Sequence, residues 1–92
     1  MTDPSAVDVR EVDSREALAA FILALSRDFE SNAQAWENVT VGSYLEAMSH
    51  WLASAHHWSA NMTRFFPDLW MDADTPSWQL FARALRVART YE

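Results

Sequence analysis

The sequence predicts a small all-α domain of three main helices, at about residues 14–30, 41–57 and 76–91. A chain of 92 residues is long enough for one domain. It holds a single glycine and three prolines, too few for a β-sandwich or a glycine-rich phosphate site. Half of the residues are apolar and 13% are aromatic, which excludes a disordered chain. Abundant alanine and leucine favour helices.

Residues 1–12 are expected to form an extended N-terminal arm, and residues 13–92 a single helical domain. Residues 7–12 alternate apolar and polar side chains, which is a weak signal for a β-strand. Because no second clear strand exists to pair with it, we interpret the segment as an arm that lies on the domain.

The first helix, at about 14–30, has a marked start and end. Asp13 and Glu16 have the spacing of a capping box, and Asn32 suits a helix C-terminus. Apolar residues recur at helical spacing and predict one buried stripe, formed by Leu18, Phe21, Ile22, Leu25 and Phe29.

The second helix, at about 41–57, is expected to begin after Thr40 as its N-cap. Its apolar face is predicted to comprise Tyr44, Leu45, Met48, Trp51, Leu52, Ala55 and Trp58. Residues 59–74 are strongly apolar, but Pro67 forbids a continuous helix. They are therefore expected to form an irregular aromatic connection that folds over the core or contacts another molecule.

The third helix, at about 76–91, is predicted from Thr75 as N-cap and Pro76 at the first helical position. Its apolar residues cover about half of the helix circumference. An arc of this width fits either a central helix of the bundle or a helix shared with a second chain, so a homodimer is one expectation.

No catalytic, cofactor-binding or metal-binding motif is found. His50 and His57 are separated by two helical turns, about 10 Å, which is too far for one ion. No histidine pair has the i, i+4 spacing of a zinc site. The chain has no cysteine, and its serines lack the sequence around a hydrolase nucleophile. We therefore expect a protein that is not an enzyme and uses no cofactor.

The charge of the chain bears on its partners and its location. The net charge is −6 and all seven basic residues are arginine, which disfavours nucleic acid. No apolar run approaches the roughly 18 residues of a membrane span. The N-terminus also lacks the basic and apolar regions of a signal peptide. These features predict an acidic, cytoplasmic protein.

Five tryptophans in 92 residues exceed what a small core requires. Trp51 and Trp78 are assigned to the core. Trp58, Phe66 and Trp70 lie in or beside the irregular segment, where they either complete the core or form an interface, since tryptophan is enriched at binding hot spots.

Three arginines, Arg83, Arg86 and Arg89, fall on one side of the third helix. One interpretation is a solvated face that complements the helix dipole and the acidic remainder of the chain. The other is a cluster that holds a phosphate or an acidic partner.

Several short strings together resemble a family of small bacterial domains of uncharacterised function: Ala35-Trp36-Glu37-Asn38, Tyr44-Leu45-Glu46-Ala47, Pro76-Ser77-Trp78 and the terminal Tyr91-Glu92. The resemblance covers about residues 12–92, and its Trp-Glu-Asn string is the most specific part. It implies a bacterial source and a compact stand-alone domain associated with toxin–immunity systems, without catalytic residues. Residues 59–74 depart from the family pattern, in which a more polar connection containing glycine is expected.

Trp36, Glu37 and Asn38 lie between the first two predicted helices. We expect Trp36 to plug the end of the bundle, Asn38 to cap or turn the chain, and Glu37 to pair with an arginine of the third helix. These roles are structural, and the alternative is that the three residues form a ligand site.

The leading functional hypothesis is a non-catalytic protein-binding module, immunity-like or regulatory, that uses residues 58–71 and acidic charge. The alternative is a small-molecule or anion-binding domain that uses the Trp36 region and the arginines of the third helix. The residues predicted to contact a partner are Trp36, Glu37, Asn38, Trp58, Phe66, Trp70, Arg83 and Arg86.

Overall fold

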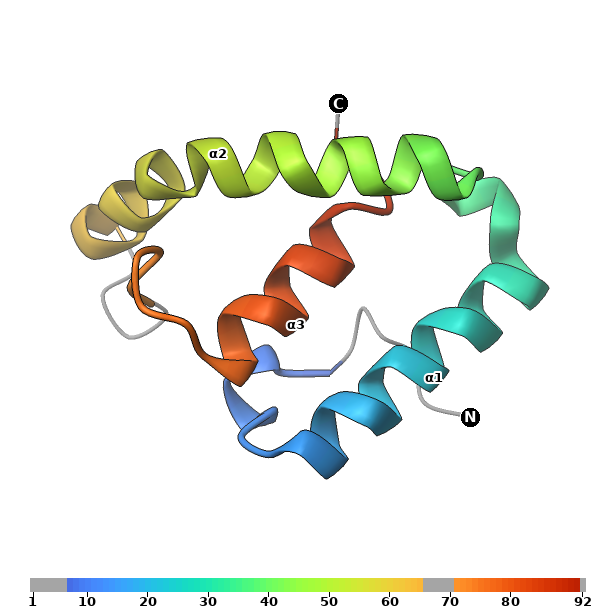
Figure 1. The fold of residues 1–92 in the computed structure, drawn as a ribbon, viewed down its shortest axis with the longest axis horizontal. Coiled ribbons are helices and arrows are strands. Elements are labelled where there is room, and N and C mark those ends of the chain that lie inside the picture. The colour runs from blue at the N-terminus through green and yellow to red at the C-terminus, as the bar shows by residue number, and fades with distance from the viewer. Residues whose placement is uncertain (1–6, 66–70, 92) are drawn as a thin grey trace.

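The computed structural model describes residues 7–65 and 71–91 of the chain. Its elements are the 3-10 turn η1 (Val9–Glu11), α1 (Arg15–Asn32), the 3-10 turn η2 (Ala33–Ala35), α2 (Val41–Phe65) and α3 (Trp78–Val87). The described residues contain no β-strand. The predicted all-α domain of three main helices is confirmed (Figure 1).

The three helices form one layer with α3 in the middle. α1 and α2 diverge from the connection that joins them, and α3 lies between them (Figure 1). α3 packs on both of the other helices, whereas α1 and α2 scarcely touch. The smallest extent of the molecule is 21 Å, about two helix diameters. α3 is therefore the central helix, as the width of its apolar arc predicts.

Small side chains let the neighbouring elements approach α3 closely. Ala82, Ala84 and Ala88 are at most 2% exposed, and the distance between packed helices depends on the side chains at the contact. Larger side chains complete the core around these alanines: Leu18, Phe21, Leu25, Trp51, Met71 and Leu80. The core is thin, because much of the buried surface of α3 consists of alanine side chains and not of large apolar ones.

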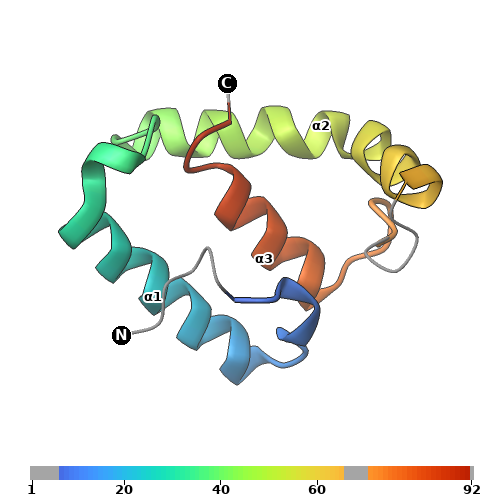
Figure 2. The same ribbon diagram turned by 180° about the vertical axis from the view of Figure 1, so that it is seen from behind.

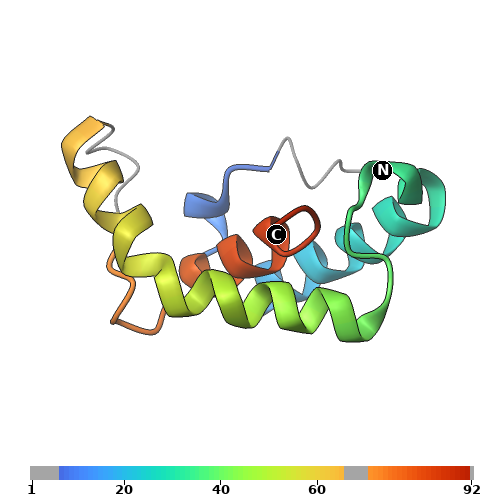
Figure 3. The ribbon, with the colours of Figure 1, turned by 90° about the horizontal axis from the view of Figure 1, so that it is seen from above.

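The N-terminal arm supplies part of this core. Val9 and Val12 are 1% and 3% exposed, and residues 7–12 lie on one side of the helical layer (Figures 2 and 3). The segment is an arm that lies on the domain, as interpreted from the sequence, but residues 9–11 of it form a 3-10 turn. Asp8 caps this turn, and hydrogen bonds from the side chain and the backbone of Arg10 lower the pKa of Asp8 to about 2.

The start of α1 differs by one residue from the expected capping box. The Ser14 hydroxyl, not the Asp13 carboxylate, accepts the hydrogen bond of the Ala17 amide at 3.1 Å. The cap of α2 is as predicted, since the Thr40 hydroxyl accepts from the Ser43 amide at 3.0 Å.

The start of α3 was predicted too early. Ser77 is its N-cap and accepts from the Leu80 amide at 3.0 Å, so Pro76 precedes the helix. Thr75 instead donates its hydroxyl hydrogen to Asp72 at 2.5 Å, in a separate turn. This bond, with one from the Asp74 amide, lowers the pKa of Asp72.

The second helix continues to Phe65 instead of ending near residue 57. The described part of the following connection folds back on it, because the Ser59 hydroxyl donates to the carbonyl of Met71 at 2.9 Å. Phe66, Pro67 and Trp70 lie outside the described residues.

The arm is expected to contribute directly to stability. Val9→Ala removes two buried methyl groups and should lower the free energy of unfolding by about 2 kcal/mol. Leu23→Ala removes more atoms, but at a side chain that is 52% exposed, and should cost less than about 0.5 kcal/mol. Urea unfolding of the two variants at one chain concentration checks this. Equal losses would show that the arm is not part of the core.

Candidate functional site

Trp36 lies where α1, the connection to α2 and the end of α3 meet. Its indole Nε1 donates a 2.8 Å hydrogen bond to Oδ2 of Asp28 in α1. Arg89 binds the same oxygen through Nη1 at 3.4 Å. The side chains of Asp28 and Arg89 are only 12% and 16% exposed, so the ion pair is largely shielded from water.

The Trp36 ring fills the end of the bundle. It meets Phe29 edge to face at 5.1 Å and stacks on Tyr44 at 5.7 Å, between ring centres. The Tyr44 hydroxyl donates to the carbonyl of Leu85 in α3 at 2.5 Å, and burial raises the pKa of Tyr44 to about 12. The aromatic groups thus join α1, α2 and α3.

Asn38 satisfies the carbonyls at the C-terminal end of α3. Its Nδ2 donates to the carbonyls of Ala88 and Tyr91, both at 2.9 Å. The amides of Glu37 and Asn38 both donate to the carbonyl of Arg89. Of these acceptors, Ala88 is the C-cap of α3, whose carbonyl lacks a partner within the helix, and Arg89 and Tyr91 follow the helix. The described contacts give the exposed Glu37 carboxylate no ion pair with α3; Arg89 instead binds Asp28.

The arginines of α3 do not form one solvated face. The Arg83 guanidinium lies 5.2 Å from the centre of the Trp58 ring in α2, and Arg86 Nη1 donates to the Val7 carbonyl at 2.6 Å. The pKa values of Arg83 and Arg86 are lowered by burial and by the neighbouring arginines. The Asp8 carboxylate opposes this shift at both residues without reversing it. The three cations therefore attach α3 to three different segments.

The predicted partner-contact residues are thus separated. Trp36, Glu37 and Asn38 gather at the end of α3, and their polar bonds are directed inward. Trp58 is half-buried and packs on Trp51 at 5.8 Å. Phe66 and Trp70 lie outside the described residues.

Several large apolar side chains expected in the core are exposed instead. Ile22 is 43%, Leu45 56%, Leu52 45% and Trp78 43% exposed, so the assignment of these residues to the core is wrong. We define the apolar face as the six exposed side chains that line two neighbouring hollows: Ile22, Val39, Val41, Leu45, Leu52 and Phe81.

The two hollows lie side by side on this face. The first has a volume of about 310 Å³ and is bounded by Ile22, Tyr44, Leu45 and Leu85, with no charged side chain. The second has about 290 Å³ and contains one charged residue, Asp74. Leu45 in one and Met48 in the other are one turn apart on α2, so the hollows are neighbours along this helix.

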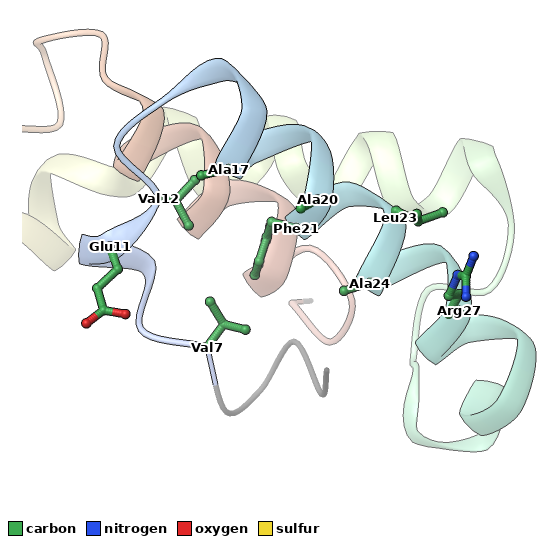
Figure 4. A pocket seen from close by; sticks show the side chains of 9 residues that line it. All are labelled: Val7, Glu11, Val12, Ala17, Ala20, Phe21, Leu23, Ala24 and Arg27. Carbon is green, nitrogen blue, oxygen red and sulfur yellow. The ribbon is translucent and has the colours of Figure 1, made fainter. Parts of the chain in front are cut away.

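A separate hollow of about 500 Å³ lies between the arm and α1 (Figure 4). Its lining is apolar except for Glu11 and Arg27, which lie at opposite ends of it (Figure 4). A small-molecule site needs a few polar groups that converge on the ligand, and this hollow does not bring two together.

The described residues contain no group of three or more histidines or acidic residues placed to hold a metal ion. Nor does any described helix combine the length and the apolar character needed to cross a membrane. The only close histidines in the described part, His56 and His57, lie side by side on the exposed surface of α2.

Comparison with known proteins gives a family but no function. Residues 14–92 match the family of unknown function DUF7660. The chain belongs to this family. No curated protein and no solved structure matches the chain. The expected membership in an uncharacterised family of small domains is thereby confirmed, over nearly the range that the resemblance covers. Within this family member, the Trp36-Glu37-Asn38 string closes one end of the bundle.

Sequence reasoning missed the apolar face, although α2 carries a signal for it. Val41, Leu45, Met48 and Leu52 follow a 4-3-4 spacing, which places them in a stripe beside the one centred on Trp51. Together the two stripes form an apolar arc on α2 that is wider than one neighbouring helix covers. The part of the arc that is left uncovered indicates a second apolar surface on α2.

Asn38→Asp should destabilise the protein more than Asn38→Ala. The alanine loses two hydrogen bonds and should cost about 1–2 kcal/mol. The carboxylate also faces two carbonyl oxygens, which raise its pKa in the folded state. The additional cost is therefore full at pH 7 and fades as the pH falls through that pKa. Thermal unfolding of both variants, each relative to the unmodified protein at the same pH, checks this; a greater loss for Asn38→Asp in acid would contradict it.

Arg86→Glu should lower the free energy of unfolding by about 2 kcal/mol. It removes a charged hydrogen bond and places a carboxylate beside the Val7 carbonyl oxygen, which repels it. Arg15→Glu makes the same charge change at an exposed residue in the first turn of α1, where negative charge is favourable. Chemical denaturation should find this control nearly neutral. Similar stability for the two variants would restore the interpretation of a solvated arginine face.

Proposed function

We propose that this protein is a non-catalytic protein-binding module and that it binds its partner through the apolar face. The observation that carries the proposal is the exposure of six large apolar side chains around two neighbouring hollows. The proposal assigns no reaction step and no cofactor. A bacterial source, a cytoplasmic location and an immunity-like or regulatory role belong to the same proposal.

The size of the face supports a macromolecular partner. The six side chains are between 43% and 76% exposed, and together they form a patch of the size class of the largest on a monomer, roughly 300–600 Å². Half-buried neighbours such as Met48 and Leu85 extend it towards the roughly 800 Å² that each partner contributes to a standard interface.

The chemistry of the face favours a protein over a small polar ligand. The wall of the hollow beside Trp36 is mostly apolar, because the indole Nε1 is hydrogen-bonded to Asp28 and the Asn38 Nδ2 to two carbonyls. The centres of protein interfaces are likewise depleted of charge. An anion site at the α3 arginines has less support, because Arg86 and Arg89 are engaged by Val7 and Asp28.

Capture from the native cell extract tests the proposal with a matched pair of variants. Leu45→Glu places a charge on the face, whereas Leu23→Glu makes the same change at a residue that is equally exposed but lies off it. The captured protein, untagged copies of this chain included, should fall at least 10-fold for Leu45→Glu and stay unchanged for Leu23→Glu.

Both variants must give the same circular dichroism signal for helix, so that a loss of captured protein reflects lost binding and not unfolding. Specific capture that survives Leu45→Glu would place the binding surface elsewhere. The absence of any stoichiometric protein partner would contradict the binding function itself.

A further inference from the structure

We infer that the occupant of the apolar face is a second copy of this chain, related to the first by a two-fold axis. The inference rests on the proposed function, because it names the partner of the same face. In such an isologous contact the same surface is used by both copies, with the two α2 helices side by side and antiparallel.

The stripe on α2 has the pattern of a helix that packs on a helix. Val41, Leu45, Met48 and Leu52 recur at intervals of four, three and four residues, which is the alternation of coiled-coil positions. The stripe runs along about three turns of α2 and contains no charged residue. An identical stripe is complementary to it when the two helices run in opposite directions.

The face carries both projecting rings and space to receive them. Phe81 of α3 is 51% exposed and lines the second hollow, whereas the first hollow has about 310 Å³. A protein cavity of about 150 Å³ is large enough to hold a benzene ring. Each copy therefore offers a ring and a hollow of sufficient size, as a self-complementary surface requires.

Charge and area agree with self-association. The net charge is −6, so two chains repel each other unless the contact lies away from the acidic groups. The first hollow contains none, and the second contains only Asp74. Two such faces together approach the roughly 1,200–2,000 Å² that a stable dimer buries.

The thin core gives a physical reason for a partner that is always present. Among the residues that the structure describes, five of the thirteen buried apolar residues are alanine: Ala47, Ala55, Ala82, Ala84 and Ala88. Leu45, Leu52 and Phe81, in contrast, remain in water. Small domains with a limited core commonly gain stability by oligomerisation, and a second copy is available wherever the first is made.

Sedimentation equilibrium of the purified full chain over a range of concentrations tests the inference. The expected mass is twice the 10.5 kDa of one chain, and the melting temperature should rise with concentration. Leu45→Glu and Phe81→Glu should each raise the dissociation constant at least 100-fold, because symmetry places the new charge in the contact twice. Leu23→Glu should remain dimeric.

The outcomes separate this inference from the proposed function. A monomer at every concentration overturns the dimer; if Leu45→Glu still abolishes capture of a different protein, the binding function stands with another partner. If the chain is a monomer and Leu45→Glu leaves the capture of other proteins unchanged, both the dimer and the proposed binding through the apolar face are overturned. A dimer that persists in the folded Leu45→Glu and Phe81→Glu variants would overturn the assignment to this face.

Discussion

The Asp28 carboxylate joins three parts of the chain at one end of the bundle, and the remaining architecture depends on that junction. It binds the Trp36 indole and the Arg89 guanidinium with one oxygen. A largely buried carboxylate without a partner is strongly unfavourable, so the pair constrains α1 and α3 together. Asn38 then satisfies the carbonyls beyond α3. With its end held in this way, α3 stays between two diverging helices, and the arm covers one side of the layer.

The helices themselves could be predicted from local chemistry, because their signals lie within a few residues of each other. The Thr40 cap and the three apolar repeats are of this kind. Ser14 and Ser77 compete with Asp13 and Thr75 as caps, and only the path of the chain decides between such neighbours. The burial of Val9 was not predictable from residues 7–12 alone, since it depends on the packing of η1 against α3.

The candidate site was harder to predict because exposure is a property of the assembled layer. Periodicity places Leu45 and Trp51 in one broad apolar arc, but α3 covers only the part that contains Trp51. Likewise, Arg83 and Arg86 look alike on a helical wheel, while the Trp58 ring and the Val7 carbonyl give them separate structural roles. The polar groups of the bundle end thus serve the fold, and we propose that the uncovered part of the apolar arc binds a partner.

A double-mutant cycle on Asp28 and Arg89 tests most directly whether this ion pair holds α3 in place. Asp28→Asn, Arg89→Met and the double variant would be unfolded in urea at one fixed chain concentration, so that any self-association contributes equally to each measurement. The account predicts that the single changes are not additive, with a coupling free energy of about 1–3 kcal/mol in favour of the pair. Additivity within about 0.3 kcal/mol would show that the two side chains do not act together and would contradict the account.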